Sequence, residues 1–284
     1  MNVACLLEDP GRTFIFNEQS KNRLAEIFSA DPKLHCWGDV KLFYPGLENA
    51  RNNLDAFIAI LNNYKNHFKP GAEYILFKGE RIVFLVKKIL KARTNHTIQF
   101  ISLIRDPRAV FASQKRTSFP GTQLIMSNDP IKTADYWKRN VRLSHFFRAE
   151  NFLIIRFEDL IMNNSSSLHI LSEFLKLNLN ELSPDKGDLL KRMSDVQIKI
   201  HENIKKMPMI QKIDEWQKEL TSSEIYIIER ISDKFLIDSG YIRIKSDHYG
   251  INIFINMRCK LLKLSVIRLF KKISFHFSRI LAGS

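Results

Sequence analysis

The stretch QFISLIRDPRAVFASQ, residues 99–114, determines the fold that we expect for this chain. Its first half belongs to an apolar run over residues 98–104 that predicts a buried strand, and a helical pattern begins at Pro107. Asp106 is a favourable N-cap, and Pro107 suits the first helical turn because its missing N–H would have no intrahelical partner there. The sequence therefore predicts a strand-to-helix turn with Arg105 at its tip.

Arg105 and Ser113 are the first candidate binding residues. A helix N-terminus presents free N–H groups and the positive end of the helix dipole, which both favour an anion. The guanidinium of Arg105 matches phosphate oxygens, and Ser113 follows two helical turns later on a face that can reach the same oxygens. We expect a phosphate to bind here. The alternative is a surface turn in which Arg105 pairs with Asp106 or another acid.

Further apolar runs alternate with helical patterns along the chain. Strands are predicted at residues 12–18, 73–78 and 151–157, and helices at residues 20–30, 54–68, 81–92 and beyond residue 158. Apolar strands separated by helices are typical of a parallel sheet covered on both faces, so the expected class is α/β. Ligands bind such sheets at the carboxyl ends of the strands, where Lys78, Arg105 and Arg156 are expected.

Composition favours a globular chain with anionic partners. Of its 284 residues 45% are hydrophobic, and no linker rich in Pro, Gly or Ser divides them, so we expect one domain at residues 1–246 and a tail at residues 247–284. The net charge of +14 favours anionic partners over cationic ones. Seven Lys or Arg and no acid lie in residues 251–284, so half of the excess charge belongs to the tail.

The cysteines, the glycosylation sequons and the N-terminal residues do not indicate a particular function. Cys5, Cys36 and Cys259 form no Cys-x-x-Cys pair or Cys/His cluster, so neither a disulfide framework nor a metal site is expected. Glycosylation sequons at residues 95–97 and 163–166 are usable only in a secretory lumen. The first residues do not form a signal peptide or an N-terminal anchor.

The chain resembles the sulfotransferases that use 3′-phosphoadenosine 5′-phosphosulfate (PAPS), especially the Golgi carbohydrate and tyrosylprotein branches. LIRDPRAVFAS is similar to their 3′-phosphate-binding motif, and three further segments follow in the family's order: LFKGERI, FLIIRFEDL and DEWQKELTSSEIYIIERISDKFLIDSGY. The resemblance covers roughly residues 6–241. It implies a P-loop-NTPase-like parallel sheet flanked by helices, PAPS as co-substrate without a metal, a carbohydrate or other hydroxyl acceptor, no nucleic-acid partner, and a Golgi location.

The resemblance also implies roles for individual residues. Arg105 and Ser113 would bind the 3′-phosphate of the donor. Phe157 stands where the family usually has Tyr, and it keeps the ring that can stack on a base. Glu18 would be the general base, and Lys78 would stabilise charge on the bridging oxygen. The alternative for Glu18 and Lys78 is a solvated surface side chain.

The sequence departs from the family at its start. No R-S-G-T-T phosphosulfate loop is found, and LLEDPGRTFIFNE resembles the segment just after that loop, as in an N-terminally truncated domain. The second hypothesis is therefore a non-catalytic relic or fragment that binds an anionic nucleotide or glycan. A nucleotide kinase is disfavoured because no Walker lysine is present. If the N-terminus is genuine, the expected location is cytoplasmic.

Several residues have structural interpretations. Arg156, Glu158 and Asp159 are expected to be structural, with the two acids capping the next helix. Trp137 and Trp216 are expected in the core or a lid.

The tail predicts a basic amphipathic helix over residues 251–281. Leu262, Val266, Leu269, Phe270 and Ile273 follow helical spacing, with most Lys and Arg on the other side. Such a helix is typical of contact with an anionic membrane surface and has too many charges to span a bilayer. The alternative is a helix docked on the domain or on a partner.

Overall fold

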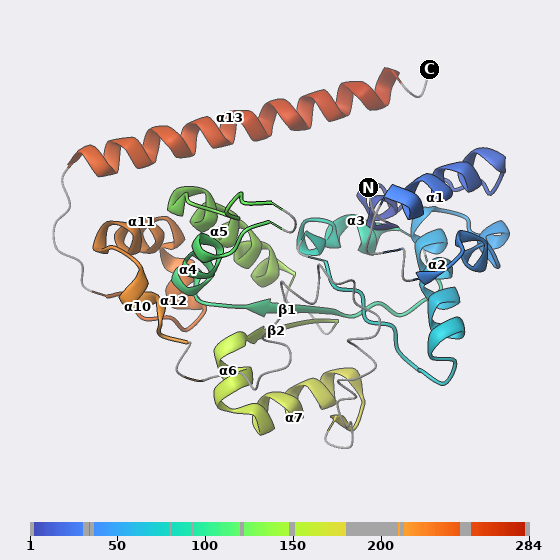
Figure 1. Cartoon of the computed structure of the whole chain (residues 1–284), viewed down its shortest axis with the longest axis horizontal. Coiled ribbons are helices and arrows are strands. Elements are labelled where there is room, and N and C mark those ends of the chain that lie inside the picture. The colour runs from blue at the N-terminus through green and yellow to red at the C-terminus, as the bar shows by residue number, and fades with distance from the viewer. Residues whose placement is uncertain are drawn as a thin grey trace. The chain divides into compact units, whose positions relative to one another are not determined.

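The computed structural model describes residues 3–30, 34, 37–79, 81–92, 94–119, 122–147, 151–179, 210, 213–244 and 251–281 (Figure 1). Contacts divide the chain into two compact units. Unit 1 comprises Met1–Ser102, Phe147–Leu153 and His169–Met207, and unit 2 comprises Leu103–Phe146, Ile154–Leu168 and Pro208–Ser284. The predicted division at residue 246 stays a prediction. Cys36 lies outside the described residues.

Unit 1 is built from helices. They are the 3-10 helices η1 (Val3–Glu8), η3 (Val40–Phe43), η4 (Leu47–Asn49) and η5 (Ile82–Phe84), with α1 (Glu18–Ala30), α2 (Asn53–Phe68) and α3 (Val86–Lys91). The predicted helices at residues 20–30 and 54–68 are confirmed. Asn52 caps α2 by accepting the N–H of Asp55, and buried Leu54, Phe57 and Ile60 form its inner face. The helix predicted at residues 81–92 is divided into η5 and α3.

Two strand predictions in unit 1 are wrong. Residues 73–78 form no strand, and the side chain of Leu76 is 85% exposed. An apolar run becomes a strand only when another strand accepts its backbone hydrogen bonds, and the described residues provide none here. Residues 12–18 make only an isolated antiparallel bridge between Thr13 and Asn52.

The chain is α/β, mostly helical, with a small two-stranded parallel sheet. Strand β1 (Phe100–Ile104) pairs with β2 (Phe152–Arg156), and the rings of Phe100 and Phe152 stack at a centroid distance of 5.9 Å. Both strands lie within predicted ones. The carboxyl ends of both strands belong to unit 2.

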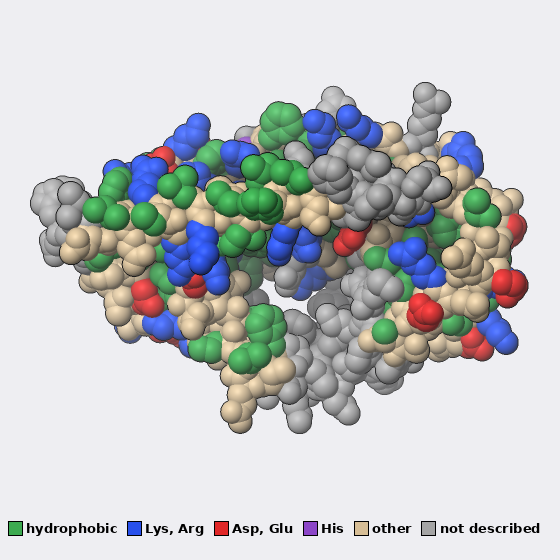
Figure 2. Space-filling model, turned by 90° about the horizontal axis from the view of Figure 1, so that it is seen from above, with side chains coloured by type: hydrophobic (Ala, Val, Ile, Leu, Met, Phe, Trp, Pro, Cys, Tyr) green, Lys and Arg blue, Asp and Glu red, His purple; other side chains and the backbone are tan. Residues whose placement is uncertain are grey.

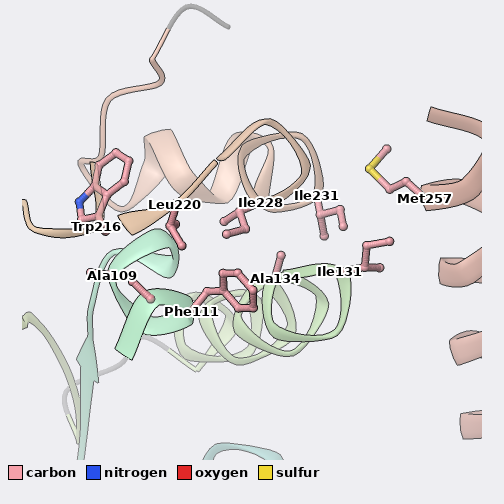
Figure 3. Close-up of a cluster of buried hydrophobic side chains, with 10 residues drawn as sticks. Ala109, Phe111, Ile131, Ala134, Trp216, Leu220, Ile228, Ile231 and Met257 are labelled. Atoms are coloured by element: carbon pink, nitrogen blue, oxygen red, sulfur yellow. The ribbon is translucent and has the colours of Figure 1, made fainter. Parts of the chain in front are cut away.

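Unit 2 surrounds these strand ends with helices. They are α4 (Pro107–Arg116), α5 (Pro130–Phe146), α6 (Phe157–Met162), α10 (Trp216–Glu219), α11 (Ser222–Ser232), α12 (Lys234–Asp238) and α13 (Ile251–Leu281), and α7 (Asn164–Leu175) spans the boundary of the two units. The start of α4 at Pro107 after the N-cap Asp106 is as predicted. Phe111, Ala134 and Ile228 are fully buried where α4, α5 and α11 meet (Figure 3). Trp137 and Trp216 are buried in the core, as expected.

Helix α13 packs against the rest of unit 2 along one side. Met257 is 3% exposed and joins the core cluster beside Ile131 and Ile231 (Figure 3). Lys260 pairs with Asp129 at 2.8 Å. None of the helices described is both long enough and apolar enough to cross a membrane.

Candidate anion-binding site

Arg105 lies between β1 and α4, as predicted, and is held at two points. Its carbonyl accepts the indole N–H of Trp137 at 2.8 Å, which fixes the backbone of the turn against the core. Its guanidinium carbon lies 4.8 Å from the centre of the Phe157 ring, the first residue of α6. The structure thus brings together two of the predicted cofactor-binding residues, because the carboxyl ends of neighbouring parallel strands meet at one edge.

The guanidinium of Arg105 has an unsatisfied donor. Its Nε is buried and makes no hydrogen bond to any residue that the structure describes. Burial lowers the pKa of Arg105, and the negative charge of Glu158 opposes this change only in part. A buried donor without an acceptor is costly, so an anionic oxygen arriving here would gain a charge-assisted hydrogen bond.

The acid next to Arg105 is already paired with another arginine. Asp106 binds the side chain of Arg108 through two nitrogens, at 2.9 Å for Nε and 2.6 Å for Nη2. Nη1 of Arg108 pairs with Glu229 of α11 at 2.5 Å, and its guanidinium lies 4.0 Å from the centre of the Trp216 ring. The pairing of Arg105 with Asp106, which was the alternative interpretation, is therefore wrong.

Sequence reasoning missed Arg108, which is 3% exposed. Burial opposes its charge, but the hydrogen bonds and charges of Asp106 and Glu229 outweigh burial and raise its pKa. The available signal was the spacing R-D-P-R, in which the second arginine follows the N-cap acid by two residues. A side chain at that position can reach back to the cap.

Glu158 connects the turn to the C-terminal part of unit 2. Its carboxylate accepts the backbone N–H of Asp106 at 3.0 Å and the phenol O–H of Tyr241 at 2.8 Å. Burial raises the pKa of Tyr241, and the negative charge of Glu158 raises it further. Glu158 and Asp159 lie in the first turn of α6, but the N-cap residue Arg156 makes no side-chain capping bond. The structural role expected for Glu158 therefore comes from long-range hydrogen bonds.

The N-terminus of α4 has fewer free N–H groups for binding an anion than the sequence predicted. The N–H of Asp106 is bound by Glu158, and the N–H of Arg108 is bound by the side chain of Asp106. Pro107 has no N–H. Since most of the N–H groups at this helix end already have acceptors, the capacity for an anion depends on the guanidinium of Arg105.

Arg156 is a second cation at the same sheet edge. Its guanidinium carbon lies 4.6 Å from the centre of the Tyr241 ring, and its buried Nε makes no hydrogen bond in the described part of the chain. Asp159 lies at 3.8 Å, a loose ion pair. Gly240, at φ 79°, permits this approach, because a Cβ there would come within 2.7 Å of Nη1 of Arg156.

Ser113 is half-buried in the middle of α4. Its carbonyl accepts the hydroxyl of Thr117 at 2.8 Å, and its own hydroxyl makes no hydrogen bond to a described residue. By helical spacing Ser113 shares a face with Asp106 and Val110. Its contact with a phosphate stays a prediction.

Glu18 and Lys78 lie in unit 1 and are both exposed. Glu18 does not end a strand but begins α1, where it pairs with Lys21 at 2.6 Å. Lys78 lies in the segment that forms no strand, so its predicted position at a strand end is wrong. The solvated surface position, which was the alternative for both residues, describes what the structure shows of them.

The described residues contain no group of three or more His, Cys, Asp or Glu side chains that is arranged to hold a metal ion.

The chain was also compared with known proteins. No protein-family model matches the chain, and no curated protein matches its sequence.

Proposed function

We propose that unit 2 binds the 3′-phosphate of PAPS and that the chain is a sulfotransferase acting on a hydroxyl acceptor, with carbohydrate as the favoured class. The proposal combines the four motifs found in the order of that family with the state of Arg105. It includes the P-loop-NTPase-like sheet and the Golgi location that the family implies.

The observation that carries the proposal is the unsatisfied Nε of Arg105. The nearby acids Asp106 and Glu158 are engaged by Arg108 and Tyr241, so neither takes this donor. The ring of Phe157 contacts the guanidinium, with 4.8 Å between the ring centre and the guanidinium carbon. A phosphate accepts such donors in pairs, which makes a nucleotide phosphate the ligand that fits this chemistry best.

Arg156 supports the same interpretation. Arg156 is the last residue of β2, and Arg105 directly follows the neighbouring strand β1. Like Arg105, Arg156 has a buried Nε without an acceptor among the described residues. Two cations at one sheet edge favour a dianionic group such as a terminal phosphate over a single carboxylate.

The transfer step is proposed from the resemblance. In sulfuryl transfer the acceptor hydroxyl loses its proton to a base, the S–O bond to the acceptor forms, and the bond from sulfur to the bridging phosphate oxygen breaks. By analogy with phosphoryl transfer, positioning and charge stabilisation dominate such a step. The resemblance implies Glu18 as the base and Lys78 as the cation for the leaving phosphate, and both are exposed side chains of unit 1. For Glu18 this role requires that its ion pair with Lys21 opens.

Calorimetry with adenosine 3′,5′-bisphosphate tests the phosphate site. Because one charge-assisted bond contributes about 1.5–3 kcal/mol, Arg105→Ala is expected to weaken binding by about ten- to hundredfold. Arg142→Ala, which removes an exposed arginine of α5, is the control of equal charge and is expected to bind nearly as the wild type does. Ser113→Ala is expected to lose less than Arg105→Ala.

Adenosine 5′-monophosphate separates the two phosphates. It lacks the 3′-phosphate, so Arg105→Ala is expected to change its affinity little. Equal losses for both nucleotides would place the role of Arg105 elsewhere, and unchanged affinity for the bisphosphate would refute the site.

The second candidate is binding of an anionic nucleotide or glycan without transfer. It is favoured by the absence of the R-S-G-T-T motif from the 284-residue sequence, because that loop would otherwise bind the 5′-phosphosulfate. Incubation with radiolabelled PAPS and a panel of carbohydrate acceptors distinguishes the candidates. Labelled acceptor supports the enzyme, whereas nucleotide binding without label supports the binding protein.

A further inference from the structure

Helix α13 has two apolar faces, and only one of them packs against other residues that the structure describes. On the inner face Met257 is buried in the core cluster, with Phe254, Leu261 and Leu264 packed against it. Arg268 pairs with Asp135 of α5 at 2.6 Å on the same side. These contacts fix the rotation of the helix about its axis, and therefore determine which side chains point away from unit 2.

The opposite face carries a second apolar row, which we call the outer stripe. Helical spacing places it about half a turn from Met257. The side chains of the outer stripe are 42–67% exposed. They are Ile255, Leu262, Val266, Leu269, Phe270 and Ile273. In Figure 2, which views the molecule from the side of α13, hydrophobic and basic side chains lie next to one another on this surface.

Cations flank the outer stripe. Arg258 and Lys263 lie on its two borders by helical spacing, and both are exposed. Residues 251–284 contain seven Lys or Arg and no Asp or Glu. Lys260 and Arg268 are neutralised within unit 2 by Asp129 and Asp135. Arg258, whose guanidinium carbon lies 5.1 Å from the centre of the Phe254 ring, and Lys263 have no such acid partner among the described residues.

Two kinds of occupant fit a row of this spacing. Ile255, Leu262 and Leu269 repeat every seven residues, and Cys259, Val266 and Ile273 follow them at four, which is also the pattern of a coiled-coil seam. In a pair of identical helices, however, Arg258 of one copy would face Lys263 of the other. Since this helix carries no acid, each such pairing places cation against cation.

We infer that the outer stripe of α13 binds the surface of an anionic lipid bilayer. The apolar side chains enter the boundary between headgroups and acyl chains, and the flanking cations contact the anionic headgroups. Charge complementarity selects this occupant over a second copy of the chain. Because the inner face stays docked, binding holds unit 2 at the membrane in a fixed orientation. This inference is independent of nucleotide binding.

Cosedimentation of the full chain with vesicles tests the inference. Binding is expected to phosphatidylcholine vesicles with about 30% phosphatidylserine and not to pure phosphatidylcholine, because the flanking cations need anionic headgroups. It is also expected to weaken strongly in about 1 M NaCl, where the screening length falls to about 3 Å. The double variant Leu262→Gln, Phe270→Gln is expected to bind at least about tenfold more weakly.

Matched controls separate the stripe from general effects. Leu124→Gln with Ile242→Gln removes two side chains that are similarly exposed outside α13, and this variant is expected to bind as the wild type does. Arg105→Ala is expected to bind vesicles normally, which excludes headgroup capture at the phosphate site. Thermal unfolding of the stripe variant is expected to match the wild type, since its two side chains are exposed.

Three results would overturn the inference. They are absence of binding above the phosphatidylcholine background, binding that the stripe variant leaves unchanged, and a dimer in solution that uses the stripe. For the last case, mild oxidation of a Cys5→Ser, Cys36→Ser background would join two copies through Cys259, which is exposed and would lie in the seam of a parallel pair.

Discussion

Arg108 is the residue that holds the turn after β1 in place. It neutralises Asp106 and Glu229 in a buried position, and these acids have no other cation at comparable distance in the described part of the chain. Arg108→Ala leaves both carboxylates buried without a counter-charge, so the free energy of unfolding is expected to fall by about 3–5 kcal/mol. Urea unfolding measures this change. Arg108→Lys is expected to recover only part of it, because an ammonium cannot bind both acids with the same fork.

The exposed Arg142 is the control for Arg108. Its replacement by alanine changes the net charge equally and is expected to alter the free energy of unfolding by less than about 0.5 kcal/mol. A similarly small effect of Arg108→Ala would show that the buried network does not stabilise unit 2.

Because of Tyr241, the free energy of unfolding is expected to depend on pH in the alkaline range. Burial raises its pKa in the folded state above the unfolded value of about 10, and Glu158 adds to this. The contribution of the protonated phenol is therefore complete below about pH 10 and is lost as the pH rises toward the folded pKa. Over that window the free energy of unfolding is expected to fall by up to about 1.4 kcal/mol per pH unit more in the wild type than in Tyr241→Phe.

Unfolding curves at about pH 9 and pH 11 measure this difference, and lysine titration cancels between the two proteins. Near neutral pH, Tyr241→Phe is expected to cost about 1–3 kcal/mol, because Glu158 loses a buried donor. If the free energy of unfolding changes with pH equally in the two proteins, the pKa of the Tyr241 phenol is not raised by folding as proposed.

At the scale of the element, local signals predicted where α2 and α4 begin, whereas the helix predicted at residues 81–92 is divided into η5 and α3. The start of α4 depends on Asp106 and Pro107, and the start of α2 depends on Asn52, which caps a residue three positions on. Such starts depend on residues within one turn, so a sequence pattern can predict them.

Strands and side-chain partners depend on distant residues. Residues 73–78 and 100–104 are similarly apolar, but among the described residues only the second run has a neighbouring strand. The same limit applies to the candidate site. The sequence predicted that Arg105 would lie at a strand end, but Glu229, the second of the two acids that bind Arg108, lies 121 residues away, so the full set of partners of Arg108 was not predictable.

At the scale of the whole molecule, the question is whether α13 folds with unit 2 or is an independent tail. Its inner face buries Met257 and pairs Lys260 with Asp129, which favours a single cooperative unit. Met257→Ala removes buried atoms from that contact, so the free energy of unfolding of unit 2 is expected to fall by about 2–5 kcal/mol. The fluorescence of Trp137 and Trp216 during urea unfolding reports on this unit.

Leu262→Ala is the matched control, because it truncates a side chain of the same helix that is 67% exposed. It is expected to change the free energy of unfolding by less than about 0.5 kcal/mol. The two substitutions thus compare opposite faces of one helix, with similar effects on helix propensity. If α13 were an independent tail, neither would change the unfolding of unit 2. The proposed membrane orientation would then fail, since a helix free to turn would not fix which face of unit 2 meets the bilayer.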